Sequence, residues 1–441
     1  MPLDAWRRHG QGVIRTVATA AVLVLLPVAG SAQRVVSTHS SRLFQPPVTQ
    51  SYDLATERLE WTEPGGIYDR RPVFTSDGRY LLSVRQTATS AATLQLKDVL
   101  SNATVILPFD FSPLIAHPRR LAIFGLSGGS AARLDEAGLH LSTSCAPATA
   151  QALDLTIDGT LLLALCASGD LVVMNADTGA IVRTVPMGAG PMTHMTARGD
   201  GSQVVVIRQG PSQEPEFALV DTVTGMTIAT TLFPPLPQPV ATPCVAQLGG
   251  VSPDRHTVVA TCRWFLQSPF LGLTTFLYRT RLLALDTLTW GRELAVPFSP
   301  VGVAIGPDNG TALVASSDPL RFGGAIQAIY VASGLATFTV GGFPYAFAAA
   351  FAPLAPALSV DVTDGRAALR WTLPAHSPAA TGHVLEAGTA PGLSNLGTLS
   401  LGPAGTLSVP AVPPGMYFVR VRAQNATGVG AASNEVVVTV P

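Results

Sequence analysis

The side chains best suited to metal or acid–base chemistry are scattered through this sequence. The eight histidines stand at positions 9, 39, 117, 140, 194, 256, 376 and 383, and no two are spaced i,i+2 or i,i+4 as paired ligands are. The four cysteines form no CxxC or CxxCH motif, so their spacing indicates neither a zinc site nor covalent haem. The sequence therefore assigns no catalytic, cofactor-binding or metal-binding residue.

Aspartates recur at equivalent positions, and their regularity has two interpretations. They are Asp77, Asp158, Asp200, Asp254 and Asp308, each in a short polar segment between two apolar ones. A ring of carboxylates for cations is one interpretation. Hairpin turns, in which aspartate bonds the local backbone, are the other and the favoured one. His117, His194 and His256 lie near the same segments and are candidates to line a channel.

The elements around these aspartates repeat along the middle of the chain. Each copy has an alternating strand, a turn such as Ser76-Asp77-Gly78-Arg79, and a strongly apolar strand. Copies start near residues 73, 114, 152, 195, 250, 302 and 345. Their spacing of roughly 40 to 55 residues suits the four-stranded blade of a β-propeller, so seven copies predict seven blades.

A second type of turn marks the outer part of each copy. Asp177-Thr178-Gly179 and Asp221-Thr222 are examples, and each is flanked by apolar strands. The segment Asp53–Glu57, with the strand after it, resembles this turn but precedes the first copy. We therefore expect N-terminal strands to complete the last blade, which removes exposed sheet edges. An open two-sheet arrangement is the alternative.

The region from about 33 to 355 resembles exported bacterial seven-bladed β-propellers of the YVTN and quinoprotein-like kind. Blade length and turns such as Ser76–Arg79 and Asp177–Gly179 carry the resemblance. The Tyr-Val-Thr-Asn strand of that family is not present as such, and Leu171–Asn175 is its distant counterpart. The resemblance implies recognition at blade-connecting loops or, as in its enzymes, chemistry within a central channel.

The C-terminal segment is predicted to form a separate β-sandwich. It comes after the linker Pro353-Leu354-Ala355-Pro356, and its strands alternate with a period of two. The segment resembles a fibronectin type III domain, with Trp371 as the core tryptophan and Tyr417 as the corner tyrosine. That resemblance implies a spacer or adhesion module. The predicted organisation is all-β, with a propeller at 33–355 and the sandwich at 356–441.

Residues 1–32 have the layout of a secretory signal peptide. Arg7, Arg8 and Arg15 precede an apolar run that Pro27 breaks, and small residues end at Ala32, where we expect cleavage. The run is too short for a membrane span, and we expect none in the mature chain. The predicted location is periplasmic, cell-surface or extracellular.

The cysteines suit such an oxidising compartment. Cys145 and Cys166 stand at the two ends of one predicted hairpin, and Cys244 and Cys262 at the ends of another. A hairpin brings its outer ends together, so the pairs Cys145–Cys166 and Cys244–Cys262 are predicted disulfides. Four small buried thiols are the alternative.

Composition excludes two classes of protein. The chain has 441 residues, of which 47% are hydrophobic and only 12% charged, unlike a disordered protein. Its net charge of −1 argues against a nucleic-acid partner. We expect a monomer without a cofactor that binds a protein or a carbohydrate.

Three long insertions are the predicted contact points for that ligand, at residues 209–216, 233–243 and 264–281. The last contains the candidate binding residues Trp264, Phe265, Phe270 and Phe276. Packing of these aromatic side chains onto a neighbouring blade is the alternative. The alternative function is an enzyme of the lactonase or quinoprotein type that acts in the channel.

Overall fold

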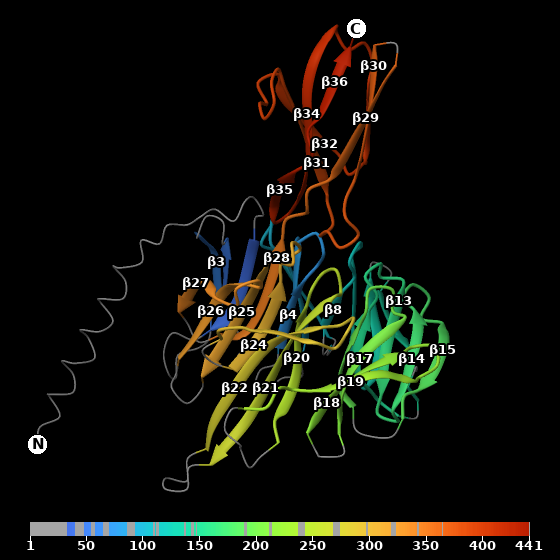
Figure 1. Cartoon of the computed structure of the whole chain (residues 1–441), viewed down its shortest axis with the longest axis vertical. Helices are drawn as coiled ribbons and strands as arrows, with labels where there is room; N and C mark the ends of the chain where they lie inside the picture. Colours follow the sequence, from blue (N-terminus) through green and yellow to red (C-terminus); the bar gives the residue numbers. More distant parts are fainter. Residues whose placement is uncertain are drawn as a thin grey trace, which may run out of the picture. The chain divides into compact units, whose positions relative to one another are not determined.

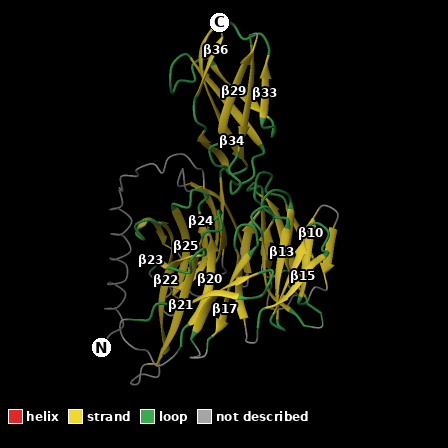
Figure 2. Ribbon diagram, turned by 45° about the vertical axis from the view of Figure 1, so that its right-hand side comes forward, coloured by secondary structure: helices red, strands yellow, loops and turns green. Residues whose placement is uncertain are grey.

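The described part of the chain is built from β-strands (Figures 1 and 2). The computed structural model describes residues 33–39, 48–53, 58–64, 70–85, 93–108, 111, 114–135, 138–142, 145–146, 148–188, 192–210, 214–236, 243–267, 274–296, 299–318, 323–341, 344–363 and 365–440. The predicted signal peptide lies outside these residues. Among them, no helix has the length and hydropathy that a membrane crossing requires. The all-β class expected from the sequence is confirmed.

Four-stranded antiparallel sheets repeat along the chain, and each is named here by its first strand (Figure 1). The β4 sheet consists of β4 (Arg70–Phe74), β5 (Tyr80–Arg85), β6 (Thr93–Asp98) and β7 (Thr104–Leu107). The β8 sheet consists of β8 (Leu114–Ala116), β9 (Ala122–Ser127), β10 (Ser130–Asp135) and β11 (Gly138–Ser142). The β12 sheet consists of β12 (Ala150–Leu155), β13 (Leu161–Cys166), β14 (Asp170–Asn175) and β15 (Ile181–Pro186).

The next three sheets repeat the same order. The β16 sheet consists of β16 (Met192–Ala197), β17 (Gln203–Gln209), β18 (Pro215–Asp221) and β19 (Thr227–Leu232). The β20 sheet consists of β20 (Val245–Val251), β21 (Thr257–Gln267), β22 (Thr274–Ala284) and β23 (Trp290–Glu293). The β24 sheet consists of β24 (Ser299–Ile305), β25 (Thr311–Asp318), β26 (Gly323–Tyr330) and β27 (Ala336–Gly341).

A further sheet joins the two ends of this array. It consists of β28 (Pro344–Phe351), β1 (Gln33–His39), β2 (Val48–Asp53) and β3 (Arg58–Pro64). β1 pairs antiparallel with β28, with Val36 opposite Ala348, as the early outer turn predicted. Each first strand contacts the first strand of the next sheet, and β28 contacts β4, so the first strands form a closed cycle.

The turns after the first strands explain the recurrent aspartates. The Asp77 carboxylate accepts hydrogen bonds from Thr75 Oγ1 (2.6 Å) and from the backbone N–H of Arg79 (3.1 Å). Gly78 comes next with a φ of 69°, a conformation that glycine adopts without a steric penalty. Asp158 and Gly159 repeat this geometry. The turn interpretation of these aspartates is thereby confirmed.

The core lies in layers between neighbouring sheets. The middle strands are buried on both faces, which is why β13 and β17 are apolar runs rather than alternating sequences. Leu163 and Val173 of the β12 sheet pack with Val204 and Val206 of the β16 sheet. Each such side chain contributes about 1.5–3 kcal/mol when it is buried. Packing between sheets therefore holds the array together.

Two predicted cysteine pairs are present. Cys145 is joined to Cys166, at a Cα–Cα distance of 5.4 Å, and Cys244 to Cys262, at 5.6 Å. Ala150 lies opposite Cys166 and Ala246 opposite Cys262, so each disulfide closes the end of a hairpin formed by a first and a second strand. The hairpin argument made from the sequence is correct for both.

The segment from 357 to 440 forms two antiparallel sheets. One contains β29 (Ala357–Thr363), β30 (Arg366–Thr372) and β33 (Thr406–Val409). The other contains β31 (Gly382–Gly388), β32 (Gly397–Leu401), β34 (Gly415–Asn425), β35 (Gly428–Ala432) and β36 (Val436–Val440). Trp371 is buried between them with Val421 and Val438, and Tyr417 Oη donates a 2.9 Å hydrogen bond to the Pro413 carbonyl. A β-sandwich is present, and its assignment to the fibronectin family remains a prediction.

Candidate functional site

A cavity of about 280 Å³ lies among the first strands of the repeated sheets. Its lining side chains come from β4, β8, β20, β24 and β28, together with Thr261 of β21. Most of its lining side chains are apolar, such as Val73, Leu114, Val303 and Phe347, but backbone and side-chain polar atoms make up about half of the exposed lining surface. None of the described lining residues carries a formal charge. This volume is at the lower limit of the pockets that hold small organic ligands.

Two polar side chains interrupt the apolar wall. Gln247 is exposed on β20, and Thr261 lies opposite it on β21. The Thr261 hydroxyl is 3.1 Å from the Thr280 hydroxyl, so it already has a partner. Sequence reasoning missed Gln247, although one signal was available. Its position on a first strand, five residues before the turn residue Ser252, is where Gln151 and Thr193 stand in the two preceding sheets.

A second cavity of about 290 Å³ lies beside the turns at the ends of the first strands. Thr75, Leu155, Ser252 and Arg255 line it, as does the segment 375–378. The backbone carbonyl of Ser76 accepts a 3.2 Å hydrogen bond from the Ala379 N–H beside that segment. The lining is therefore mixed, with backbone and hydroxyl groups among apolar side chains.

The charged groups at this second cavity form a buried pair. Arg255 Nη1 lies 2.5 Å from Asp154 Oδ2, and the side chains are only 16% and 12% exposed. Asp154 Oδ2 also accepts hydrogen bonds from the Ala197 N–H (2.8 Å) and from Thr196 Oγ1 (3.1 Å). The carboxylate thus connects the β12, β16 and β20 sheets. Both charges serve this contact, which fits a structural role.

Other polar groups near the turns connect turns within one sheet or in neighbouring sheets. Arg198 Nη2 lies 2.5 Å from Asp286 Oδ1, and His256 Nδ1 lies 2.6 Å from Asp286 Oδ2. Asn309 Nδ2 donates a 2.6 Å hydrogen bond to Asp254 Oδ2. These side chains therefore position turns relative to one another.

The histidines proposed to line a channel do not come together. His117 is buried, and its Nδ1 accepts a 3.0 Å hydrogen bond from the Arg119 N–H. Burial, together with the Arg120 charge, lowers the pKa of His117 and favours the neutral imidazole. His194 Nδ1 is 3.1 Å from the Thr193 hydroxyl. Over the described ranges, no three His, Cys, Asp or Glu side chains are grouped as metal ligands would be.

The carboxylates of the turns are held in their charged form by local hydrogen bonds. Burial acts to raise the pKa of Asp158, but hydrogen bonds from Thr156 and Thr160 outweigh it and lower that pKa. The backbone N–H of Ser202 is the main cause of the lowered pKa of Asp200. These oxygens are already occupied by turn donors, so a ring of cation ligands is not the arrangement observed.

A serine flanked by glycines matches the nucleophile-elbow pattern GxSxG. The run is Gly125-Leu126-Ser127-Gly128-Gly129. The structure places it at the turn between β9 and β10, where Gly128 and Gly129 have φ values of 57° and 79°. A nucleophile elbow joins a strand to a helix, whereas this run joins two strands of one hairpin. The match is explained by the turn.

The predicted aromatic binding loop is mainly an extension of a hairpin. β21 and β22 are 11 residues long and include Trp264, Phe265 and Phe276. Trp264 is only 5% exposed and packs on Phe233, with ring centroids 5.8 Å apart. Trp264 therefore packs against the neighbouring sheet, as the packing alternative stated, and a role of this loop in binding stays a prediction.

The remaining residues of that loop stand differently. Phe265 is half-buried beneath the Arg263 guanidinium, whose Cζ is 5.0 Å from the ring centroid. Phe276 lies opposite Phe265 in the strand register, but its side chain is not among those described. Phe270 lies outside the described residues altogether.

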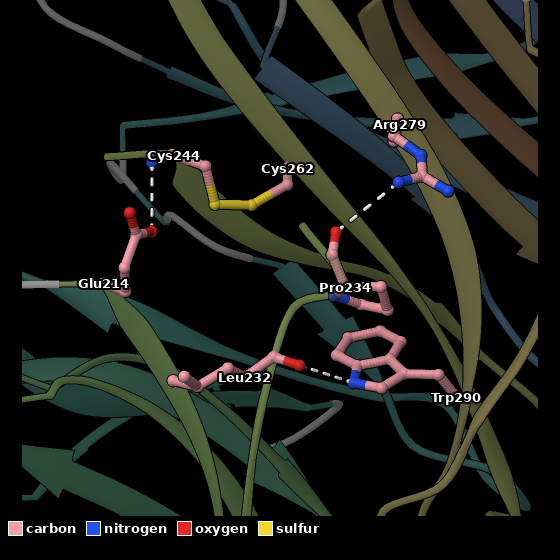
Figure 3. Close-up of a disulfide and its surroundings, with 7 residues drawn as sticks. All are labelled: Glu214, Leu232, Pro234, Cys244, Cys262, Arg279 and Trp290. Atoms are coloured by element: carbon pink, nitrogen blue, oxygen red, sulfur yellow. Dashed lines mark hydrogen bonds between the residues drawn. A yellow bond between two sulfur atoms is a disulfide. The ribbon is translucent and has the colours of Figure 1, made fainter. Parts of the chain in front are cut away.

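The other two insertions, residues 209–216 and 233–243, make hydrogen bonds near the Cys244–Cys262 disulfide (Figure 3). Trp290 Nε1 donates a 2.7 Å hydrogen bond to the Leu232 carbonyl, and Arg279 Nη1 donates one to the Pro234 carbonyl at 3.5 Å (Figure 3). Glu214 accepts a 3.5 Å hydrogen bond from the Cys244 N–H (Figure 3). Residues 211–213 and 237–242 of these insertions are outside the described part.

Comparison with known proteins finds similarity in structure only. No protein-family model matches the sequence, and no curated protein matches it significantly. A Bacteroides fragilis protein provisionally named a 6-phosphogluconolactonase is 17% identical, with a TM-score of 0.48 over 72% of this chain and 98% of that one. The β-propeller domain of Myceliophteria thermophila Cps50 (Swd1) is 15% identical, with a TM-score of 0.46 over 62% and 87%.

A third similar structure is the dihydro-heme d1 dehydrogenase NirN. It is 11% identical, with a TM-score of 0.46 over 71% of this chain and 74% of that one. At these identities and TM-scores the three likenesses assign no function to this chain. The repeated four-stranded sheets and the closed cycle of their first strands confirm the coarse expectation of a propeller, whereas a bacterial YVTN type is not supported.

Proposed function

We propose that this chain is an exported binding protein built on a seven-bladed β-propeller, and that its C-terminal sandwich is a fibronectin type III spacer or adhesion module. The closed cycle of first strands supports the ring and its blade count. Two disulfides in hairpins support an oxidising compartment. The buried Trp371 and the Tyr417 hydrogen bond support the identity of the sandwich.

One observation favours ligand binding over catalysis as the function of this chain. The ionisable groups near the turns are engaged in structural contacts, as in the Asp154–Arg255 pair and the bonds to Asp158. The open wall of the cavity among the first strands instead offers apolar side chains and an amide. Such a wall suits recognition, whereas acid–base catalysis needs a positioned ionisable group.

The ligand we propose for the propeller surface is a protein or a carbohydrate. The hairpin of β21 and β22 extends the β20 sheet with half-exposed apolar side chains, of which Leu277 is 40% exposed. Apolar side chains at the tip of an extended hairpin are suited to contact with a partner.

Peptide and glycan arrays probed with the purified chain test this function, with a parallel assay of lactone hydrolysis. We expect saturable binding to one class of array ligand and no lactone turnover above the buffer rate. Leu277→Ser should weaken that binding, whereas Leu335→Ser, a control at a 63% exposed leucine in the turn between β26 and β27, should not. Saturable lactone hydrolysis without array binding would instead establish the alternative enzymatic function.

A further inference from the structure

The cavity among the first strands has one polar group without a structural task, the side-chain amide of Gln247. Gln247 is exposed on β20 and lines the cavity. Its carboxamide makes no hydrogen bond within the part of the chain that the structure describes. A glutamine amide offers two donors and one acceptor oxygen, so it can bind a group that both donates and accepts.

The position of Gln247 is set by the repeat. Thr156, Arg198 and Ser252 each begin a turn with a backbone hydrogen bond to the residue five places later, at 3.0, 2.9 and 2.7 Å. Five residues before these turns stand the exposed side chains of Gln151, Thr193 and Gln247. The repeated sheets therefore place one polar side chain at this level of three consecutive first strands.

The wall beside Gln247 is apolar because the next sheet has a valine at the matching position. In the β24 sheet that position is Val301, where the strand register shifts. A bulge of this kind re-aims a side chain, and Val301 lines the cavity. Phe347 and Val73 extend the apolar wall from β28 and β4.

Close packing makes this wall rigid. A Cβ at Gly250 would lie 2.6 Å from the Val303 carbonyl oxygen, and a Cβ at Gly302 would lie 2.9 Å from the Phe347 Cβ. Both approaches require glycine, because Gly250 lies against the β24 backbone and Gly302 against the Phe347 side chain of β28. The shape beside Gln247 is therefore fixed before any ligand enters, which lowers the entropic penalty of binding.

From this juxtaposition we propose that the cavity binds a small uncharged molecule with an apolar body and a terminal amide or similar group, which pairs with Gln247. The inference rests on the proposed binding function and names the ligand class of this cavity. An ionised group should be excluded, because no described lining residue carries a charge to compensate it.

Hexanamide is the probe, with hexanoate as a charged molecule of the same length, and titration calorimetry of the purified chain is the measurement. We expect saturable hexanamide binding and at least about tenfold weaker hexanoate binding. Gln247→Leu should weaken hexanamide binding at least about fivefold through the lost hydrogen bonds. Gln151→Leu, the matched control outside this cavity, should bind as the wild type does.

A second variant tests the cavity without changing Gln247. Val301→Phe fills the cavity and should abolish hexanamide binding, and circular dichroism melting curves of all variants should match the wild type. If a variant unfolds, the comparison of hexanamide with hexanoate on the wild type still decides. Equal binding of the two molecules, absent hexanamide binding, or unchanged binding by Gln247→Leu would each overturn the inference. If the chain still binds an array ligand but fails the hexanamide test, only the ligand class proposed for the cavity is wrong. If it binds neither an array ligand nor hexanamide, the proposed binding function is also wrong.

Discussion

Individual polar residues in this protein act mainly between sheets. Asp154 accepts hydrogen bonds from the β16 sheet and pairs with Arg255 of the β20 sheet, 101 residues away in sequence. Removal of one partner from a buried ion pair strongly lowers the free energy of unfolding, because the other charge stays buried. Exposed pairs contribute much less, since water screens them. We therefore expect the loss of a buried ion pair to lower the free energy of unfolding more than the loss of an exposed one.

Arg255→Gln should lower the free energy of unfolding by about 3 kcal/mol, because Asp154 would keep its buried charge without a counter-charge. Glutamine replaces arginine at a φ of 61°, so the backbone strain is similar in both. Arg120→Gln is the control, since Arg120 and Asp177 are 42% and 60% exposed, and should have an effect below about 1 kcal/mol. Urea denaturation measures both, and equal effects would refute the structural role of the buried pair.

His117 should make stability depend on pH. Burial lowers the pKa of His117 in the folded chain below the ordinary value of 6.5, so the unfolded chain binds a proton more readily. The stability that the neutral His117 side chain contributes is fully present above pH 6.5, and it is lost as the pH falls from 6.5 through the lowered pKa of His117. His117→Asn keeps an acceptor for the Arg119 N–H but cannot titrate. Unfolding free energies at several pH values should show a shallower slope for this variant, and an unchanged slope would contradict the assignment.

At the scale of the element, the first turn of each sheet serves both as a local hairpin and as a contact with the neighbouring sheet. Gly159 has a φ of 76°, and a Cβ there would lie 2.4 Å from Nε2 of His117 in the β8 sheet. Gly179, in an outer turn, has a φ of 70° with no atom within 4 Å of its added Cβ. The two glycines share their backbone conformation but differ in their surroundings.

Gly159→Ala should therefore destabilise the chain more than Gly179→Ala. The second variant carries only the left-handed conformational penalty of about 1–2 kcal/mol. The first adds displacement of the buried His117 and should exceed it by at least about 1 kcal/mol. Thermal and urea unfolding of both variants measure the difference. Equal destabilisation by the two variants would mean that the close contact between the Gly159 turn and His117 does not limit the side chain at position 159.

At the scale of the whole molecule, N-terminal strands complete the β28 sheet. β1 covers the edge of β28, and Arg34 of β1 pairs with Glu60 of β3 at 2.7 Å within the same sheet. Without these strands β28 would present unpaired backbone groups and the uncovered side chains of an open sheet. Open edges of this kind recruit other chains.

Deletion of residues 1–64 should therefore produce a chain that aggregates, whereas deletion of residues 1–32 alone should leave a monomer. Size-exclusion chromatography with light scattering separates these outcomes. The shorter deletion is the control, because it leaves β1, β2 and β3 intact. A monomeric and cooperatively folding chain after the longer deletion would show that these strands are not needed to complete the array.

The sequence by itself determined the local features of this protein. Turns such as Ser76–Arg79 and the cysteine pairs at hairpin ends depend on hydrogen bonds and distances within about 20 residues, so the repeat was enough to predict them. The pairing of β1 with β28 was also predictable from the sequence, because an outer turn stood before the first copy.

Only the tertiary structure decided which side chains the neighbouring sheets cover. The sequence left Trp264 as either a contact residue or a packing residue, and the structure places it on Phe233; Asp154 meets Arg255 across an intervening sheet. Gln247 occupies the same repeat position as Gln151 and Thr193, and only the structure shows that Gln247 lines a cavity. Such contacts depend on how successive sheets are rotated about one another, and that rotation arises from packing summed over the whole array rather than from any short segment.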